Sequence, residues 1–214
     1  IIALSFQPLS RIIERITDPI FFKGHFEAQH LLKLVSQTLP TTILIRELSQ
    51  TVLETIGREI KSRSSRIFLT DRRGKIVDRY AQGSSRTAPL NEKDFALIYK
   101  NAGNQTLVLE DLEEGPLKEA MRADQFSLVF PLRVKGELVG FFTTGEKSSG
   151  DIYSTEEISV LEILMPEIAV ALANAKAYAS IVKFNITLKE EILKATHKLK
   201  VANEKLKVLD QIKD

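Results

Sequence analysis

Histidine and carboxylate side chains are the first candidates for chemistry in this chain. His25 and His30 are five positions apart, with Glu27 between them. Two histidines bind zinc well when they lie four residues apart on one helix face, or when a third ligand converges on them. Neither condition is evident here. We therefore interpret these side chains as solvent-facing helix residues and expect no metal site.

A second candidate is an acidic segment whose side chains could attract a cation: Glu110, Asp111, Glu113 and Glu114. Nothing close to it in the sequence fixes a ligand geometry, so we interpret it as a solvated loop. The chain also lacks the glycine-rich patterns that cradle phosphates and the G-x-S-x-G pattern of seryl nucleophiles. The sequence therefore predicts no catalysis in these 214 residues and no cofactor.

Composition narrows the class of protein further. The chain is 43% hydrophobic and 27% charged, which is typical of a globular protein. A net charge of +2 gives the chain no strong positive potential that would attract nucleic acid, so we expect no nucleic-acid partner. Cysteine is absent, which excludes disulfides and thiol chemistry and suits a cytoplasmic location. No uninterrupted apolar run reaches the roughly 18 residues of a membrane span.

The predicted elements run from helices through strands to a long final helix. Apolar residues recur at helical spacing over residues 26–61, interrupted around Pro40. Two hairpins follow, at 66–81 and 126–147, with short helices and one short strand between them. Strands joined by tight turns are antiparallel. The predicted fold class is therefore α+β, an antiparallel sheet flanked by helices.

The final helix has a well-marked start. Ser154 and Glu157 form the S-x-x-E pattern of a capping box, and Tyr153 and Ile158 have the spacing of a hydrophobic staple. Pro166 then falls inside the helix, where proline removes a hydrogen bond and clashes with the preceding turn at a cost of about 3 kcal/mol. We expect a kink or a local break at residues 162–166.

The second hairpin and the final helix carry a family resemblance. The segment FSLVFPLRVKGELVGFFTTGEKSSGDIYSTEEISVLEILMPEIAVALANAKAY resembles the closing hairpin, the G-E-K loop, the S-x-E-E helix start and the A-L-x-N-A helix of GAF domains. GAF domains are small-molecule-sensing and signalling modules. The resemblance extends over about residues 30–178 and implies a GAF-like domain, which we place at 26–178.

The GAF resemblance also implies where a ligand would bind. In that family the ligand lies between the sheet and the loops after its second and third strands, here residues 83–105 and 110–125. Five aromatic side chains are candidates for such a pocket: Phe68, Tyr80, Phe95, Tyr99 and Phe130. The same rings could instead fill an ordinary core, leaving a vestigial pocket, and we favour that alternative.

Two ligand classes known for GAF domains fit this sequence poorly. Covalent bilin attachment requires a cysteine, and the chain has none. The N-K…F…D-E signature of cyclic-nucleotide binding is matched only by Asn91, Lys93 and Phe95, without the acidic pair. Any small-molecule ligand therefore stays unidentified at the level of sequence.

Beyond Tyr178 the apolar residues alternate at spacings of three and four, between flanking lysines and glutamates. Such a narrow stripe is typical of a coiled coil, because a lone soluble helix gains nothing from it. We predict a homodimer with these interface residues: Ile181, Asn185, Leu188, Ile192, Leu199 and Leu206. Asn185 either fixes the register of the pair or lies exposed at a frayed edge.

Both ends of the chain resemble parts of bacterial sensor histidine kinases. KVANEKLKVLDQIKD resembles the connector that enters their dimerisation and phosphoacceptor domain, and PLSRIIERITDPIFFKGHFE resembles the linker that follows their membrane-embedded region. The resemblance implies a linker helix at 1–25 and a coiled-coil signalling helix at 179–214, leading to a kinase core in the same chain. His197 is followed by Lys198 rather than an acidic residue, so we interpret it as an exposed residue and not as the phosphoacceptor.

The function that we expect is the sensory and signal-transmitting region of a two-component sensor histidine kinase, with a response regulator as an indirect partner. The parent protein would be an ATP-dependent kinase, cytoplasmic here and anchored in the inner membrane by upstream segments. Two alternatives stay open. One is a regulatory GAF module of a cyclic-nucleotide phosphodiesterase or a diguanylate cyclase, and the other is a stand-alone interaction module.

Overall fold

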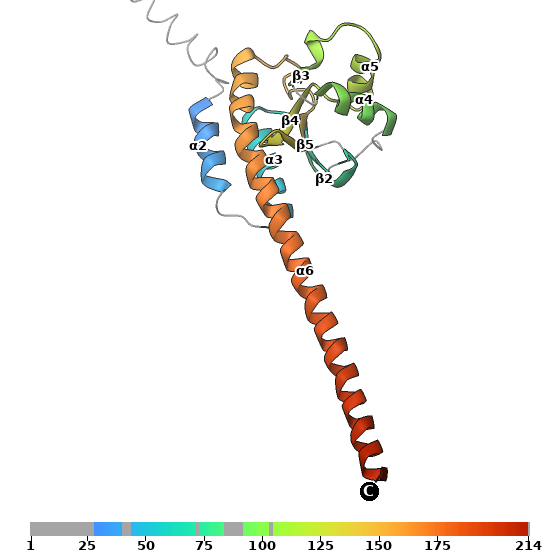
Figure 1. Ribbon diagram of the computed structural model, residues 1–214. Helices are drawn as coiled ribbons and strands as arrows, with labels where there is room; N and C mark the ends of the chain where they lie inside the picture. The colour runs from blue at the N-terminus through green and yellow to red at the C-terminus, as the bar shows by residue number, and fades with distance from the viewer. Residues whose placement is uncertain (1–27, 40–43, 72, 84–91, 103–104, 214) are drawn as a thin grey trace, which may run out of the picture.

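The computed structural model describes residues 28–39, 44–71, 73–83, 92–102 and 105–213, without the side chains of Thr38, Glu92 and residues 204–213. The predicted linker helix at 1–25 lies outside these residues. The elements, labelled as in Figure 1, are α2 (Ala28–Thr38), α3 (Ile45–Glu59), β1 (Ser64–Thr70), β2 (Ile76–Gly83), α4 (Glu92–Ala102), β3 (Leu107–Val108), η2 (Leu109–Asp111), α5 (Pro116–Ala123), β4 (Leu128–Val134), β5 (Glu137–Thr144) and α6 (Thr155–Lys213).

The strands form a five-stranded antiparallel sheet in the order β2-β1-β5-β4-β3. Both predicted hairpins are present. The β4–β5 turn places Lys135 at φ 49° and Gly136 at φ 85°, the left-handed pair that suits the twist of a two-residue hairpin turn. Strand β1 is buried along its whole length because it lies inside the sheet, between β2 and β5. The predicted α+β class with an antiparallel sheet is confirmed.

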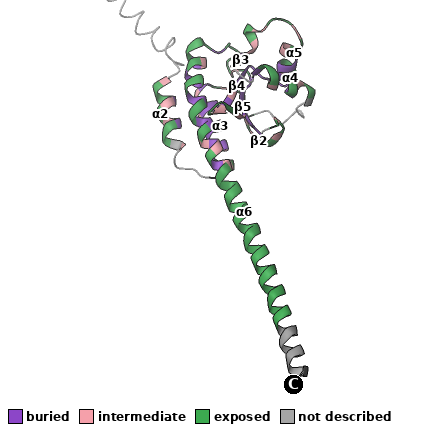
Figure 2. Cartoon of the chain, in the orientation of Figure 1, coloured by how far each residue is buried: buried purple, intermediate pink, exposed green. Residues whose placement is uncertain are grey.

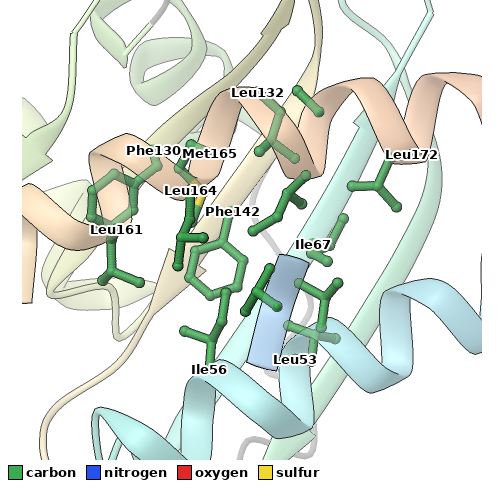
Figure 3. Close-up of a cluster of buried hydrophobic side chains, with 14 of the residues drawn as sticks. Leu53, Ile56, Ile67, Phe130, Leu132, Phe142, Leu161, Leu164, Met165 and Leu172 are labelled. Atoms are coloured by element: carbon green, nitrogen blue, oxygen red, sulfur yellow. The ribbon is translucent and has the colours of Figure 1, made fainter. Parts of the chain in front are cut away.

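One face of the sheet is covered by α3 and α6, with α2 packed against both helices (Figure 1). Figure 3 shows how Ile67, Phe130 and Phe142 of the sheet meet Leu53 of α3 and Leu164 of α6. Each fully buried side chain of this size contributes about 1.5–3 kcal/mol by leaving water. This cluster therefore fixes α6 on the sheet and makes it part of the domain core.

The opposite face of the sheet is covered by α4 and α5. Their apolar side chains form a second buried cluster with Phe68, Val129 and Phe141 of the sheet. The sheet thus separates two hydrophobic layers, and α6 belongs to the first.

Helix α6 runs from Thr155 to Lys213 with Pro166 inside it, so the expected local break was wrong, and a kink at this residue stays a prediction. Pro166 is exposed, whereas Leu164, Met165 and Ile168 around it are buried. The proline ring therefore lies on the solvent side of the helix. Packing on both sides of Pro166 offsets the lost hydrogen bond and holds the helix together.

The second half of α6 leaves the domain as an exposed rod (Figure 2). Among the described side chains of the helix, Ala175 is the last that is buried, Lys176 is partly buried, and every residue from 177 to 203 is exposed. By length and composition α6 could also cross a membrane, since its most apolar 18-residue window has a mean hydropathy of 1.6. However, 44% of that window is buried inside the protein, as expected of a helix that covers a sheet.

Candidate functional site

A cluster of aromatic rings fills the layer between the sheet and α4. Phe68 of β1 lies with its ring centroid 5.8 Å from that of Phe95 and 6.0 Å from that of Phe126. Phe141 of β5 lies 5.9 Å from Phe95 and 5.7 Å from Tyr99, both edge-on. Tilted and edge-to-face pairs at these distances are favourable. The interior of this layer is therefore occupied by packed rings.

The five aromatic residues singled out in the sequence divide between the two faces of the sheet. Phe68, Phe95 and Tyr99 come together in the ring cluster. Tyr80 and Phe130 belong to the opposite cluster, where Phe130 lies 6.3 Å from Phe142. Tyr80 and Phe130 therefore do not share a pocket with the other three. That this set binds a ligand stays a prediction.

Sequence reasoning missed two rings of the cluster, Phe126 and Phe141. The neighbouring pair Phe141 and Phe142 carried a usable signal, because successive side chains of a strand point to opposite faces. One ring of such a pair must face each layer. Phe126 precedes β4 and carried no comparable signal.

A buried pair of charges closes one end of the ring cluster. Arg66 and Asp124 are 6% and 5% exposed, and Arg66 Nη1 donates to the backbone carbonyl of Asp124 at 3.2 Å. The guanidinium also lies 5.2 Å from the centroid of the Phe126 ring, a cation–π arrangement. Oδ2 of Asp124 has no hydrogen-bond partner among the described residues. The pair thus holds two charges in a largely apolar layer.

Burial sets the ionisation of this pair. Burial is the main cause that raises the pKa of Asp124, the nearby charge of Asp94 also raises it, and Arg66 lowers it, so that the pKa is about 6. Burial also lowers the pKa of Arg66, against the attraction of Asp124. Desolvation disfavours the charged form in both cases. Asp124 is therefore a carboxyl that changes charge close to physiological pH.

A pocket of about 540 Å³ opens at the rim of the same layer, between the β1–β2 turn, β2 and α4. Its wall combines three cationic side chains, Arg73, Lys75 and Arg79, with Phe95 and Tyr99. Its size is within the usual range of small-molecule sites, about 300–1,000 Å³. We call it the rim pocket.

The β1–β2 turn beside the rim pocket is held by Asp71. Its Oδ1 accepts hydrogen bonds from the backbone amides of Arg73 and Lys75, both at 2.9 Å. These bonds, that of Lys75 first, lower the pKa of Asp71. Gly74 adopts φ +79°, and an added Cβ would come 2.6 Å from Cζ of Tyr99. The turn therefore requires glycine here both for its backbone conformation and for contact with the ring.

The start of α6 is bound to the end of β5 by a second polar group. The predicted capping box is confirmed: the Ser154 amide donates to Glu157 Oε2 at 2.8 Å, and the Glu157 amide donates to Ser154 Oγ at 3.2 Å. Lys147 Nζ also contacts both carboxylate oxygens of Glu157, at 2.8 and 3.0 Å. Glu157 is buried, so this ion pair ties the loop after β5 to the first turn of α6.

The predicted interface residues lie on the exposed rod of α6. Ile181, Ile192 and Leu199 are 58%, 55% and 68% exposed, and Leu188 is 40% exposed. Asn185 is exposed as well, and Leu206 is helical with its side chain outside the described part. That these residues form a dimer interface stays a prediction.

The remaining sequence candidates do not converge on a site. His30 is exposed on α2, His197 is exposed on α6, and His25 lies outside the described residues. Glu114 is bound by Arg122 through two hydrogen bonds of 2.9 Å, which lower its pKa. Within the described ranges, no group of three histidine or acidic side chains is arranged to hold a metal ion.

A five-stranded antiparallel sheet with helices on both faces is the fold expected from the GAF resemblance, and comparison with known families gives the same result. The sequence profile of the GAF domain family matches residues 43–173. The chain belongs to the GAF domain family. No curated protein sequence matches it.

Solved structures share this fold at low sequence identity. Residues 122 to 287 of a methyl-accepting chemotaxis protein align with a TM-score of 0.54 at 15% identity, covering 67% of this chain and 98% of that one. The GAF domain of a phosphoenolpyruvate-protein phosphotransferase from Coxiella burnetii aligns with a TM-score of 0.51 at 18% identity, covering 72% of this chain and 99% of that one. The GAF domain of the potassium sensor histidine kinase of Escherichia coli aligns with a TM-score of 0.51 at 14% identity, covering 71% of this chain and 96% of that one.

Proposed function

We propose that this chain is the sensory and signal-transmitting region of a dimeric sensor histidine kinase. The observation that carries the proposal is the continuity of α6. One unbroken helix lies buried in the domain core up to Ala175 and then presents an exposed heptad stripe from Tyr178 onward. A change in the core therefore has a rigid element through which it can reach a partner helix.

The stripe supports pairing with a second copy of the chain. Its spacing alternates between three and four, which places one apolar seam along a helix that supercoils with an identical partner. Asn185 takes a core position of that seam, where a polar residue fixes register at some cost in stability. The likeness of the tail to kinase connectors and the histidine kinase among the structural neighbours favour a kinase core downstream.

The signal in this proposal is a shift between two helix pairings. Strand β5 places Phe141 in the ring layer and Phe142 in the α6 layer, and its end leads through Lys147 to the start of α6. A ligand in the ring layer can shift the pairing only by binding the two states with different affinity. No catalytic step is assigned to these residues, and phosphate transfer belongs to the downstream core.

Sedimentation velocity tests the dimer. The double substitution Ile192→Lys and Leu199→Lys places two charges in the seam, and we expect a dimer to become a monomer. Glu190→Lys with His197→Lys adds the same number of lysines on the outer face of the heptad and should leave the mass unchanged. A wild-type monomer, or equal behaviour of both variants, contradicts the proposed seam.

A separate measurement tests the kinase assignment. With ATP, the full-length parent protein should phosphorylate one of its own histidines, and the seam variant should reduce that signal, whereas the outer-face variant should not. If the parent protein dimerises through the seam but carries no histidine that accepts phosphate, the kinase assignment is refuted. The proposed signalling through helix pairing would still stand.

A further inference from the structure

The rim pocket has the electrostatics of an anion site. Arg73, Lys75 and Arg79 line it, and among its described lining residues there is no carboxylate. Arg79 pairs with Phe68 across β1 and β2, so it points to the ring layer, whereas Asp78 pairs with Leu69 and points to the other face. Asp71 of the turn attracts Arg73 and Lys75, and its Oδ1 accepts hydrogen bonds from two backbone amides, but it is one carboxylate against three cations. The pocket therefore keeps an excess of positive charge.

The other wall of the rim pocket is lined by apolar and aromatic side chains. Phe95 and Tyr99 of α4 line it together with Ile76. Deeper in the layer, Phe68 and Phe141 pack against Phe95, so rings occupy the interior between the sheet and α4. A ligand would thus bind at the rim, with its charge on the arginines and its plane against Tyr99.

From this arrangement we infer that the rim pocket binds a small organic anion, a carboxylate or phosphate carried on a planar apolar group. Arginine binds both anions through paired hydrogen bonds, and an aromatic wall favours a flat ligand body. The inference names the ligand class for the sensory role proposed above and rests on that role. It assigns recognition to the β1–β2 turn and α4, and leaves the packed rings of the interior in place.

Strand β1, which leads into this turn, is in contact with α6 where that helix leaves the domain. Lys176 Nζ donates to the backbone carbonyl of Thr70 at 2.8 Å, and Thr70 is the last residue of β1 before the turn. Lys176 directly follows the last buried residue of α6. An anion that draws Arg73 and Lys75 inward acts on the segment whose carbonyl holds the exit of α6. The pocket is therefore placed to bias the direction of the exposed rod.

Calorimetric titration of the whole 214-residue chain with three probes tests the inference. Phenyl phosphate carries both features, inorganic phosphate carries the charge alone, and phenol carries the ring alone. We expect saturable binding of phenyl phosphate, at least about tenfold weaker binding of inorganic phosphate, and none of phenol. Arg79→Gln should lower the affinity for phenyl phosphate by about tenfold or more, because a charge-assisted hydrogen bond is lost.

Arg58→Gln is the matched control, since Arg58 is an exposed arginine of α3 on the other side of the sheet, and it should bind like wild type. Absence of saturable phenyl phosphate binding, equal weakening by both substitutions, or equal affinity for inorganic phosphate would overturn the inference. The seam variant should bind as wild type does, because the pocket lies within one protomer. Loss of the dimer and loss of the pocket are thus separate results.

Discussion

At the scale of single residues, Asp124 is a buried carboxyl with a large pKa shift. It lies in the ring layer beside Arg66, and Asp94 adds a second negative charge nearby. Its pKa of about 6 against an ordinary value of 3.8 means that the folded protein holds this proton more tightly than the unfolded chain. Protonated Asp124 therefore favours the folded state, and that contribution is lost as pH rises through about 6.

This sign gives a direct prediction for Asp124→Asn. As pH rises from about 4 to 6.5, the free energy of unfolding of the wild type should fall because Asp124 loses its proton. The asparagine variant has no such proton to lose, so its free energy of unfolding should change less with pH. Urea denaturation at several pH values measures it. Glu113→Gln, a change on an exposed side chain, serves as the control and should keep the wild-type slope. An asparagine variant with the wild-type slope would show that Asp124 does not titrate in this window.

At the scale of elements, the first turn of α6 depends on one buried ion pair. The side chains of Lys147 and Glu157 are 15% and 6% exposed, and Glu157 also closes the capping box with Ser154. Removing one partner of a buried pair leaves the other charge without compensation in an apolar setting, which is strongly destabilising. The join between β5 and α6 is therefore a sensitive point of the proposed relay.

We expect Lys147→Met to lower the free energy of unfolding by about 3 kcal/mol. Arg63→Met removes a cation from the exposed pair with Glu146, whose side chains are 52% and 73% exposed, and should cost no more than about 1 kcal/mol. Chemical denaturation of both variants measures the difference. If Lys147→Met and Arg63→Met lower the free energy of unfolding equally, Glu157 is better hydrated than its burial indicates.

At the scale of the whole molecule, a sensory domain is joined to a rod whose described residues, 177–203, lie outside the core of their own chain. In the proposed dimer, the rod is stabilised by its twin, and Asn185 sits in the seam as a polar interruption. Such a residue limits affinity while it selects the correct register. A switch between pairings requires this limited stability, because a seam that is too strong holds one state only.

Asn185→Ile tests this role. The substitution should tighten the dimer by about tenfold or more, since burying an isoleucine side chain contributes about 1.5–3 kcal/mol. Lys183→Ile, on the outer face of the heptad, should leave the dissociation constant measured by sedimentation equilibrium unchanged. A dimer that is weakened by isoleucine at position 185 would place Asn185 outside the seam.

The sequence by itself determined the features that depend on local spacing. The Lys135-Gly136 turn predicted its hairpin, Ser154 and Glu157 predicted the helix start, and the alternation of three and four predicted a helix that runs on beyond the domain. Each of these patterns lies within a few residues along the chain, so propensity and periodicity are enough. The local break expected at Pro166 did not occur, because the local cost of proline was outweighed by packing on the sheet.

Only the tertiary structure decided which residues meet across the chain. Strand β4 is apolar on both faces, so its sequence did not show that Phe130 belongs to the α6 layer and not to the ring layer. Arg66 and Asp124 are 58 positions apart, and Lys176 and Thr70 are 106 positions apart. Long-range contacts of this kind follow from how the sheet pairs and which helix covers each face, and no local periodicity encodes them.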